Sequence, residues 1–153
     1  PNWDLKNQYA ALRLRQKENR WVCTLKIKSS ENIHIEITEE IESEKAKKMI
    51  DGKGFFAYEV EQRLNELNVP IEQLQVVASI TTDRTELQYK EGTLVFDRSF
   101  YLNCEDYEVE YETNNEILGK TIFEEFLKEH KIEKKYADKK IARYMKALNS
   151  KEG

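Results

Sequence analysis

The sequence predicts an α+β fold with mostly antiparallel β-structure and helices packed outside the strands. Several stretches alternate strictly between apolar and charged residues, as half-buried strands do. Three other stretches carry apolar residues at helical spacing. A chain of 153 residues is long enough to build one domain with its own core. We therefore expect a single domain over residues 1–153, without an internal linker.

Residues 10–28 predict a β-hairpin with one apolar and one basic face. A polar run at residues 16–20 separates two alternating segments and forms the turn. Successive strand residues point to opposite faces, so the basic side chains share one face; they are Arg13, Arg15, Lys26 and Lys28. We expect like charges to face one another there, which is unfavourable without an anion. The face is either solvated or a cradle for an oligophosphate or polycarboxylate.

Two further stretches predict strands with an acidic face. Residues 33–41 alternate isoleucine with polar residues and place Glu36 on the polar side. Residues 107–112 alternate aromatic or aliphatic residues with three carboxylates, which are Glu108, Glu110 and Glu112. Carboxylates on one strand face repel each other. This face is therefore either solvated or a site for a hard divalent cation such as Mg²⁺ or Mn²⁺.

Residues 74–89 and 93–102 predict another pair of strands joined by a turn. Arg84 lies in the first strand and Asp97 interrupts an apolar run in the second. Asp97 has two interpretations that the sequence leaves open. It is either a carboxylate that points inward or the partner of the neighbouring Arg98 in a salt bridge at the strand edge.

Apolar residues at helical spacing predict three helices, at residues 55–67, 116–131 and 136–148. Residues 42–51 are also prone to form a helix. In the last of these helices the stripe expected to face inward comprises Ile141, Tyr144, Met145 and Leu148. Lys140 and Arg143 lie one turn apart on the flank of this stripe. Amphipathic helices need an apolar sheet face to cover. The charged strand faces should therefore look to solvent or into a closed barrel, which would enclose them together.

Composition excludes several classes of function. The net charge of −4 argues against a general nucleic-acid-binding protein. There is no run of 18 apolar residues to span a membrane, and no signal peptide is visible, so we expect a cytoplasmic protein with neither nucleic acid nor membrane as partner. The sequence contains no glycine-rich phosphate loop, Cys/His metal pattern or nucleophile elbow. It does not indicate the oligomeric state.

The ordered set of strand and helix segments resembles the CYTH superfamily. The segments that carry this resemblance are LRLR, WVCTLK, IHIEITEE, ITTDRTELQY, TLVFDRSFY, YEVEYE and KKIARYMKAL. The superfamily includes class IV adenylate cyclases, thiamine triphosphatases and inorganic triphosphatases, and the likeness is greatest to bacterial stand-alone members grouped with the adenylate cyclases. The resemblance implies an eight-stranded antiparallel β-barrel, a triphosphate tunnel with charged side chains inside and helices outside. The family's N-terminal ExExK strand has no counterpart here, and we expect it to be missing from this sequence rather than from the protein.

The resemblance also implies a role for each charged position. The residues that would bind the triphosphate are Arg13, Arg15, Lys26, Lys28, Arg84, Lys140 and Arg143. The residues that would hold Mg²⁺ or Mn²⁺ are Glu36, Asp97, Glu108, Glu110 and Glu112, with the family's ExE pair at Glu108 and Glu110 or at Glu110 and Glu112. The catalytic residues would be Lys26, Arg84 and Lys140.

The function implied is metal-dependent hydrolysis of an organic or inorganic triphosphate. The cations would stabilise in-line transfer of the terminal phosphoryl group to water. Three alternatives stay open. They are a class IV-type adenylate cyclase, a non-catalytic module that binds polyphosphate or nucleotide, and an RNA-binding β domain that uses the basic hairpin.

Overall fold

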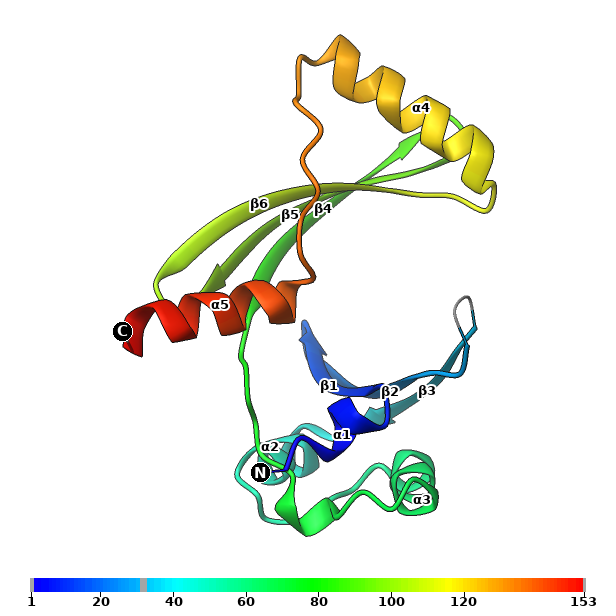
Figure 1. The fold of residues 1–153 in the computed structure, drawn as a ribbon. Coiled ribbons are helices and arrows are strands. Elements are labelled where there is room, and N and C mark those ends of the chain that lie inside the picture. The colour runs from blue at the N-terminus through cyan, green and yellow to red at the C-terminus, as the bar shows by residue number, and fades with distance from the viewer. Residues whose placement is uncertain (1, 31–32, 153) are drawn as a thin grey trace. The chain divides into compact units, whose positions relative to one another are not determined.

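The structure, a computed structural model, describes residues 2–30 and 33–152. Its strands form two three-stranded antiparallel sheets, with strand orders β1-β2-β3 and β4-β5-β6 (Figure 1). The chain divides into two compact units, unit 1 over residues 1–76 and unit 2 over residues 77–153. None of the helices in the described part of the chain has the length and apolar character needed to span a bilayer.

Unit 1 contains the first sheet and the helices that cover it. Its elements are α1 (Asp4–Asn7), β1 (Ala10–Lys17), β2 (Arg20–Lys28), β3 (His34–Ile41), α2 (Ser43–Ile50), α3 (Tyr58–Glu66) and the short 3-10 helix η1 (Ile71–Gln73). Unit 2 contains the second sheet and two longer helices. Its elements are β4 (Thr81–Tyr89), β5 (Gly92–Tyr101), β6 (Cys104–Glu112), α4 (Glu116–Glu129) and α5 (Lys140–Glu152).

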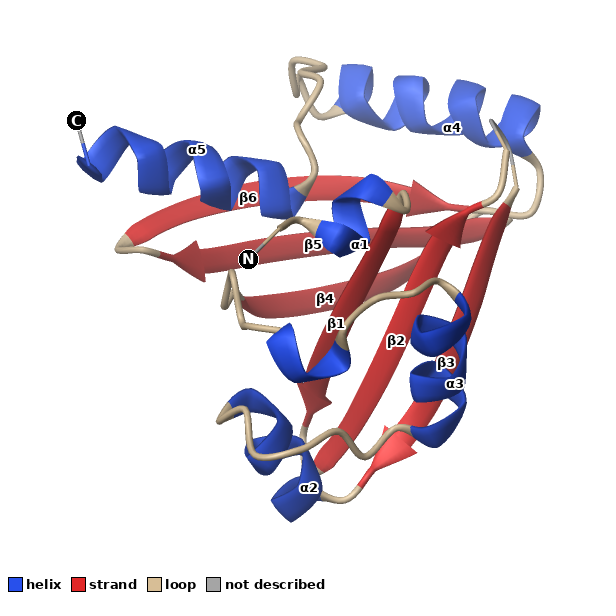
Figure 2. Ribbon diagram, turned by 60° about the horizontal axis from the view of Figure 1, so that its bottom comes forward, coloured by secondary structure: helices blue, strands red, loops and turns tan. Residues whose placement is uncertain are grey.

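Helices α2 and α3 cover the apolar face of the sheet in unit 1 (Figure 2). The predicted hairpin is confirmed, and alternation places Cys23 and Leu25 fully buried on this face, packed with Val60 and Leu64 of α3. A carboxylate also joins strand and helix, because the backbone N–H of Val60 donates to Oε2 of Glu39 at 2.9 Å. This bond satisfies one of the free N–H groups at the start of α3. Apart from Glu39, the charged residues that alternate with this apolar set lie on the other face of the sheet, among them Arg13, Arg15, Lys26 and Glu36.

The two faces of the sheet in unit 2 carry different helices (Figure 1). Helix α4 packs on an apolar face around the fully buried Leu94, and Phe126 of α4 lies edge-on to Tyr89 with ring centroids 5.4 Å apart. Asn115 caps the start of α4 by accepting a hydrogen bond from the N–H of Leu118 at 3.1 Å. Helix α5 lies against the opposite, polar face and contacts it through ion pairs.

Two parts of the predicted fold differ from the observed sheets. The described residues contain six strands in two sheets, and neither sheet closes on itself, so the eight-stranded barrel is not seen. The predicted strand over residues 74–89 shortens to Thr81–Tyr89, because residues 74–80 have no partner strand in the described ranges. The boundary between the units falls within this stretch, where no linker was predicted. The single domain over the whole chain stays a prediction.

Two helices begin later than predicted. Helix α3 begins at Tyr58 rather than at residue 55, and α5 begins at Lys140 rather than at residue 136. The apolar stripe of α5 is also only partly correct. Tyr144 contacts Tyr101 of β5 with ring centroids 6.1 Å apart, but Ile141 is exposed. Ion pairs with the sheet, which helical periodicity does not report, hold this helix.

Candidate functional site

The polar face of the sheet in unit 2 carries a connected set of charged side chains. In the strand register, Arg84 of β4 lies opposite Asp97 of β5, and Asp97 lies opposite Glu108 of β6. Directly opposed residues of antiparallel strands point to the same face. The register therefore brings these three side chains into one row across the sheet.

Asp97 is the centre of this row. It is only 3% exposed, and Arg84 binds it with both arms of the fork, Nε to Oδ1 at 2.7 Å and Nη2 to Oδ2 at 2.8 Å. Lys140 of α5 donates a further hydrogen bond to Oδ2. The hydrogen bonds from Arg84, and then those of Lys140, lower the pKa of the Asp97 carboxyl from 3.8 to about 2 despite its burial. Asp97 is therefore an anion that two cations hold in place.

The predicted alternative, a salt bridge between Asp97 and Arg98, is wrong. Arg98 points to the opposite face of the sheet, where its Nε donates to Oε1 of Glu105 at 2.6 Å. Its guanidinium also lies over the ring of Phe100, 4.8 Å from the centroid. Neighbouring residues in a strand cannot pair across the sheet. Asp97 is thus an inward carboxylate, the first of the two interpretations.

The two carboxylates of this row lie close to a third, that of Glu110. Asp97, Glu108 and Glu110 each present an oxygen atom within 4.8 Å of the others. Burial, and then the neighbouring Glu108 carboxyl, raises the pKa of Glu110. Hard oxygen ligands of this kind suit Mg²⁺ or Mn²⁺, and a cation would relieve the repulsion that raises the pKa of Glu110. The side chains present therefore fit a divalent cation.

The geometry favours one register for the predicted ExE pair. Glu108 and Glu110 belong to the acidic group of Asp97, Glu108 and Glu110, and Glu112 lies outside it. Glu112 lies opposite Thr93, farther along the ladder. Its charge still contributes to the raised pKa of Arg84, after the hydrogen bond to Asp97.

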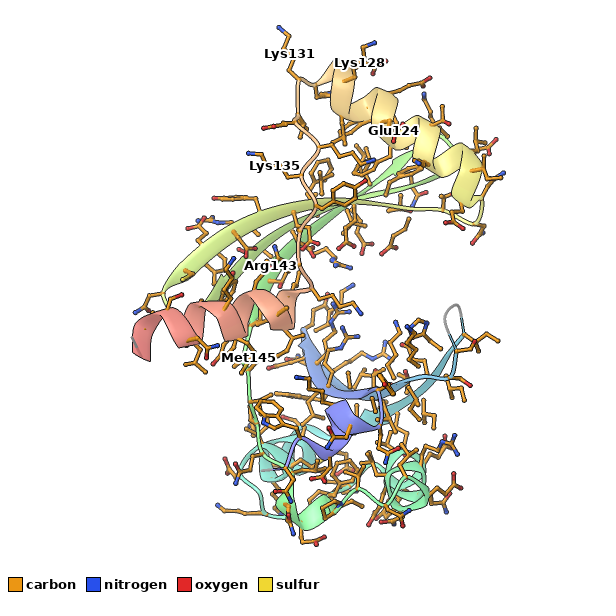
Figure 3. All side chains as sticks on the ribbon, viewed as in Figure 1. Glu124, Lys128, Lys131, Lys135, Arg143 and Met145 are labelled. Carbon is orange, nitrogen blue, oxygen red and sulfur yellow. The ribbon has the colours of Figure 1, made fainter. Side chains whose placement is uncertain are left out.

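Helix α5 places a second cation on this face. Arg143 points from α5 toward the sheet, whereas Met145, predicted to face inward, points the other way (Figure 3). Nη2 of Arg143 donates to Oε2 of Glu108 at 2.7 Å, and Nη1 lies 3.3 Å from Oδ1 of Asp106. Burial disfavours the charge of Arg143, but the hydrogen bond to Glu108 and the charge of Asp106 outweigh this effect and raise its pKa. Lys140 and Arg143 of α5 thus contact Asp97 and Glu108, respectively.

Two residues of this face were not predicted from the sequence. Asp106 contacts Arg143, and its Oδ2 accepts a hydrogen bond from the hydroxyl of Tyr101 at 2.6 Å. This hydrogen bond, followed by burial, raises the pKa of Tyr101. Strand parity could have found Asp106, because it extends the alternation of Glu108 and Glu110 by one step toward the N-terminus.

The basic face of the hairpin lies in unit 1. Glu36 lies opposite Lys26 and forms an ion pair with it at 3.5 Å, both side chains being about half exposed; the other basic residues predicted for this face are Arg13, Arg15 and Lys28. The predicted opposition of like charges is wrong for these four residues. Arg13 lies opposite Thr24 and Arg15 opposite Val22, because the register staggers the two arginines from Lys26 and Lys28.

The predicted site residues therefore fall into two sets. The set on the polar face of the sheet in unit 2 comprises Arg84, Asp97, Glu108, Glu110, Glu112, Lys140 and Arg143. The set on the charged face of the sheet in unit 1 comprises Arg13, Arg15, Lys26, Lys28 and Glu36. In unit 2 the structure joins most members of its set by direct contacts.

Comparison with known proteins identifies the family. A model of the CYTH domain matches residues 1–145. A relative from Bacillus subtilis (strain 168), named "Putative triphosphatase YjbK", is 33% identical over 145 residues, which cover 92% of this chain and 72% of the relative. A crystal structure described as a "putative adenylate cyclase" from Bacillus halodurans superposes with a TM-score of 0.81 at 34% identity, covering 94% of this chain and 76% of that one. The resemblance seen in the sequence is thus confirmed, and the chain belongs to the CYTH domain family.

Proposed function

We propose that this protein binds a triphosphate together with Mg²⁺ or Mn²⁺ and hydrolyses it as a phosphoric anhydride hydrolase. The observation that carries the proposal is the contact of three cations with the acidic group on one sheet face. Asp97, Glu108 and Glu110 would hold the cation, and Arg84 and Lys140 would contact the phosphates. The name of the Bacillus subtilis relative, a triphosphatase, agrees with this reaction class.

The charge balance of the face indicates what kind of ligand it accepts. Arg84, Lys140 and Arg143 are each already paired with a carboxylate, and the carboxylates of β6 outnumber them once Asp106 and Glu112 are included. A bare polyanion would therefore meet a negative surface. A triphosphate complexed with a divalent cation brings positive charge to the carboxylates and phosphate oxygens to the arginines and the lysine.

The cations of the chain would act on the charge of the transferring group. Arg84 and Lys140 would stabilise negative charge on the phosphoryl oxygens, since donors fixed in advance need no reorganisation during the reaction. A divalent cation bound by the acidic group would supply Lewis acidity toward a phosphoryl oxygen. Lys26 of the basic face is the third proposed catalytic residue.

The basic face of unit 1 would supply further phosphate contacts. We assign these to Arg13, Arg15 and Lys28 together with Lys26, because guanidinium forks and ammonium groups are the usual partners of phosphate oxygens. A metal-ligating role for Glu36 or Glu112 and a cytoplasmic location stay part of this proposal.

The second candidate is a nucleotide cyclase. The crystal structure from Bacillus halodurans with a TM-score of 0.81 is described as a "putative adenylate cyclase". In that reaction the ribose 3′-hydroxyl attacks the α-phosphate, and pyrophosphate leaves. The same cations and carboxylates could serve either reaction, so the products distinguish the two.

The decisive experiment compares Glu110→Gln with a matched control, Glu105→Gln. Both carboxylates lie on β6, but Glu105 pairs with Arg98 on the opposite face. Wild-type protein should release inorganic phosphate from at least one triphosphate in a panel, only with Mg²⁺ or Mn²⁺. Glu110→Gln should abolish this release and reduce the rise in melting temperature that the metal causes, while Glu105→Gln changes neither.

Other outcomes of this experiment point elsewhere. Pyrophosphate and a cyclic nucleotide as products would establish the cyclase. Binding without turnover would establish a non-catalytic module. A larger rise in melting temperature with a short oligonucleotide than with tripolyphosphate, at equal phosphate concentration, would favour RNA binding. Full hydrolysis by Glu110→Gln with undiminished stabilisation by metal would exclude the acidic group as the metal site.

A further inference from the structure

A line of contacts fixes Arg143 from two sides. Its Nη2 donates to Glu108 at 2.7 Å, and its Nη1 lies 3.3 Å from Asp106. Asp106 is not a member of the acidic group of Asp97, Glu108 and Glu110. The other oxygen of Asp106 accepts a hydrogen bond from the hydroxyl of the buried Tyr101 at 2.6 Å. Three elements, β5, β6 and α5, are thereby joined at one guanidinium.

We propose that Asp106, braced by Tyr101, is a positioning residue that holds Arg143 for contact with a phosphate group of the ligand. This inference rests on the proposed function, because it presupposes a phosphate ligand on this face. The side chains of Arg143 and Asp106 are 15% and 24% exposed, so solvent screens their attraction only in part.

The two ends of the guanidinium have different partners, and this difference carries the argument. Glu108 is a candidate cation ligand, so a bound cation would compete for the carboxylate that Nη2 now contacts. Asp106 lies outside the acidic group and can keep Nη1 in place while Nη2 turns to a phosphate oxygen. An arginine that is ordered before the ligand arrives loses less conformational entropy on binding.

Tyr101 has the matching role toward Asp106. With Oδ2 held by the tyrosine hydroxyl, Oδ1 is directed at Arg143. Oδ1 of Asp106 and Nε of Arg143 are both buried and have no hydrogen-bond partner in the described ranges. For Oδ1 of Asp106, the ion pair with Nη1 of Arg143 therefore offsets burial, and the geometry of this pair depends on the tyrosine that holds Oδ2.

The sign of the effect on affinity distinguishes positioning from electrostatics alone. Asp106→Asn removes a negative charge, so electrostatics alone predicts tighter binding of a polyanion. Positioning predicts weaker binding, by about threefold or more, because a charged hydrogen-bond donor is no longer held in place. Tyr101→Phe changes no charge and should weaken binding in the same direction. The probe is bismethylene triphosphate, a non-hydrolysable analogue of tripolyphosphate, titrated calorimetrically with Mg²⁺ into the full chain.

Matched controls lie on the other face of the same sheet. Asp83→Asn removes an exposed carboxylate opposite Arg98, and Tyr107→Phe removes a tyrosine hydroxyl that donates to Glu105. Neither should change the affinity. In an Arg143→Gln background, Asp106→Asn should cause no further loss, because its effect passes through the arginine.

A second readout does not depend on ligand. The NMR cross-peak of the Arg143 Nε–Hε group, assigned by its loss in Arg143→Gln, should broaden or shift in Asp106→Asn and Tyr101→Phe and stay unchanged in both controls. An unchanged cross-peak, or equal or tighter binding in both variants, overturns the positioning role. If Asp106→Asn does not fold, Tyr101→Phe decides. A wild-type chain that binds no analogue but shows the cross-peak changes would refute the proposed function and retain the Asp106–Arg143 contact.

Discussion

Replacing Asp97 with asparagine should destabilise unit 2 by an amount that depends on pH. The pKa of the Asp97 carboxyl falls from 3.8 to about 2 on folding, which corresponds to about 2 kcal/mol of stability near neutral pH. Asparagine would leave Arg84 and Lys140 without their shared anion. Both cations keep about a quarter of their side-chain surface in solvent. The loss of unfolding free energy should therefore stay below that caused by breaking a fully buried pair.

The direction of the pH dependence follows from the lowered pKa. A carboxyl whose pKa falls on folding contributes its full stability above its unfolded value of 3.8 and loses it as the pH falls toward about 2. The free energies of unfolding of wild type and Asp97→Asn, measured with EDTA, should therefore differ by about 2 kcal/mol at pH 7 and converge between about pH 4 and 2.

The assay has to report on the right unit. Trp3 and Trp21 both lie in unit 1, so tryptophan emission does not monitor the sheet that contains Asp97. Amide NMR signals of β5 and β6 across a urea series provide the local measurement. Glu105→Gln, which breaks an exposed pair with Arg98, is the control and should have a small effect. A difference between wild type and Asp97→Asn that persists undiminished at pH 2 would refute the reasoning.

Three further predictions follow from other parts of the structure. Arg13→Ala and Arg15→Ala should each weaken tripolyphosphate binding by about 1.5–3 kcal/mol in calorimetry and leave the fold intact; wild-type affinity in both would contradict their phosphate role. Glu39→Ala removes the hydrogen bond to the start of α3 and should cost about 1 kcal/mol of unfolding free energy, whereas no change in a urea titration would contradict that capping role. Burial, and then the charge of Glu39, raises the pKa of Cys23 to about 12. A thiol reagent at pH 8 should therefore modify the half-buried Cys104 before Cys23, and equal rates of modification would refute this order.

The sequence by itself determined which residues share a face. In a strand the side-chain period is two, so the separation of the basic residues from Leu25, and of Glu108 and Glu110 from Val109, could be read without a structure. The ordered segments were also sufficient to recognise the family. Helix ends were less certain, because the start of α5 depends on contacts with the sheet rather than on its own spacing.

Only the tertiary structure decided which charges meet. Periodicity assigns Asp97 to a face, but the register of three strands places it between Arg84 and Glu108. Lys140 lies 43 residues from Asp97 in the sequence, and local spacing holds no information about such a contact. The role of Asp106 likewise follows from the approach of Arg143 on α5. The face to which a strand residue points is a local property of the backbone. The ion-pair partner of that residue depends on strand register and helix docking, which the whole chain determines.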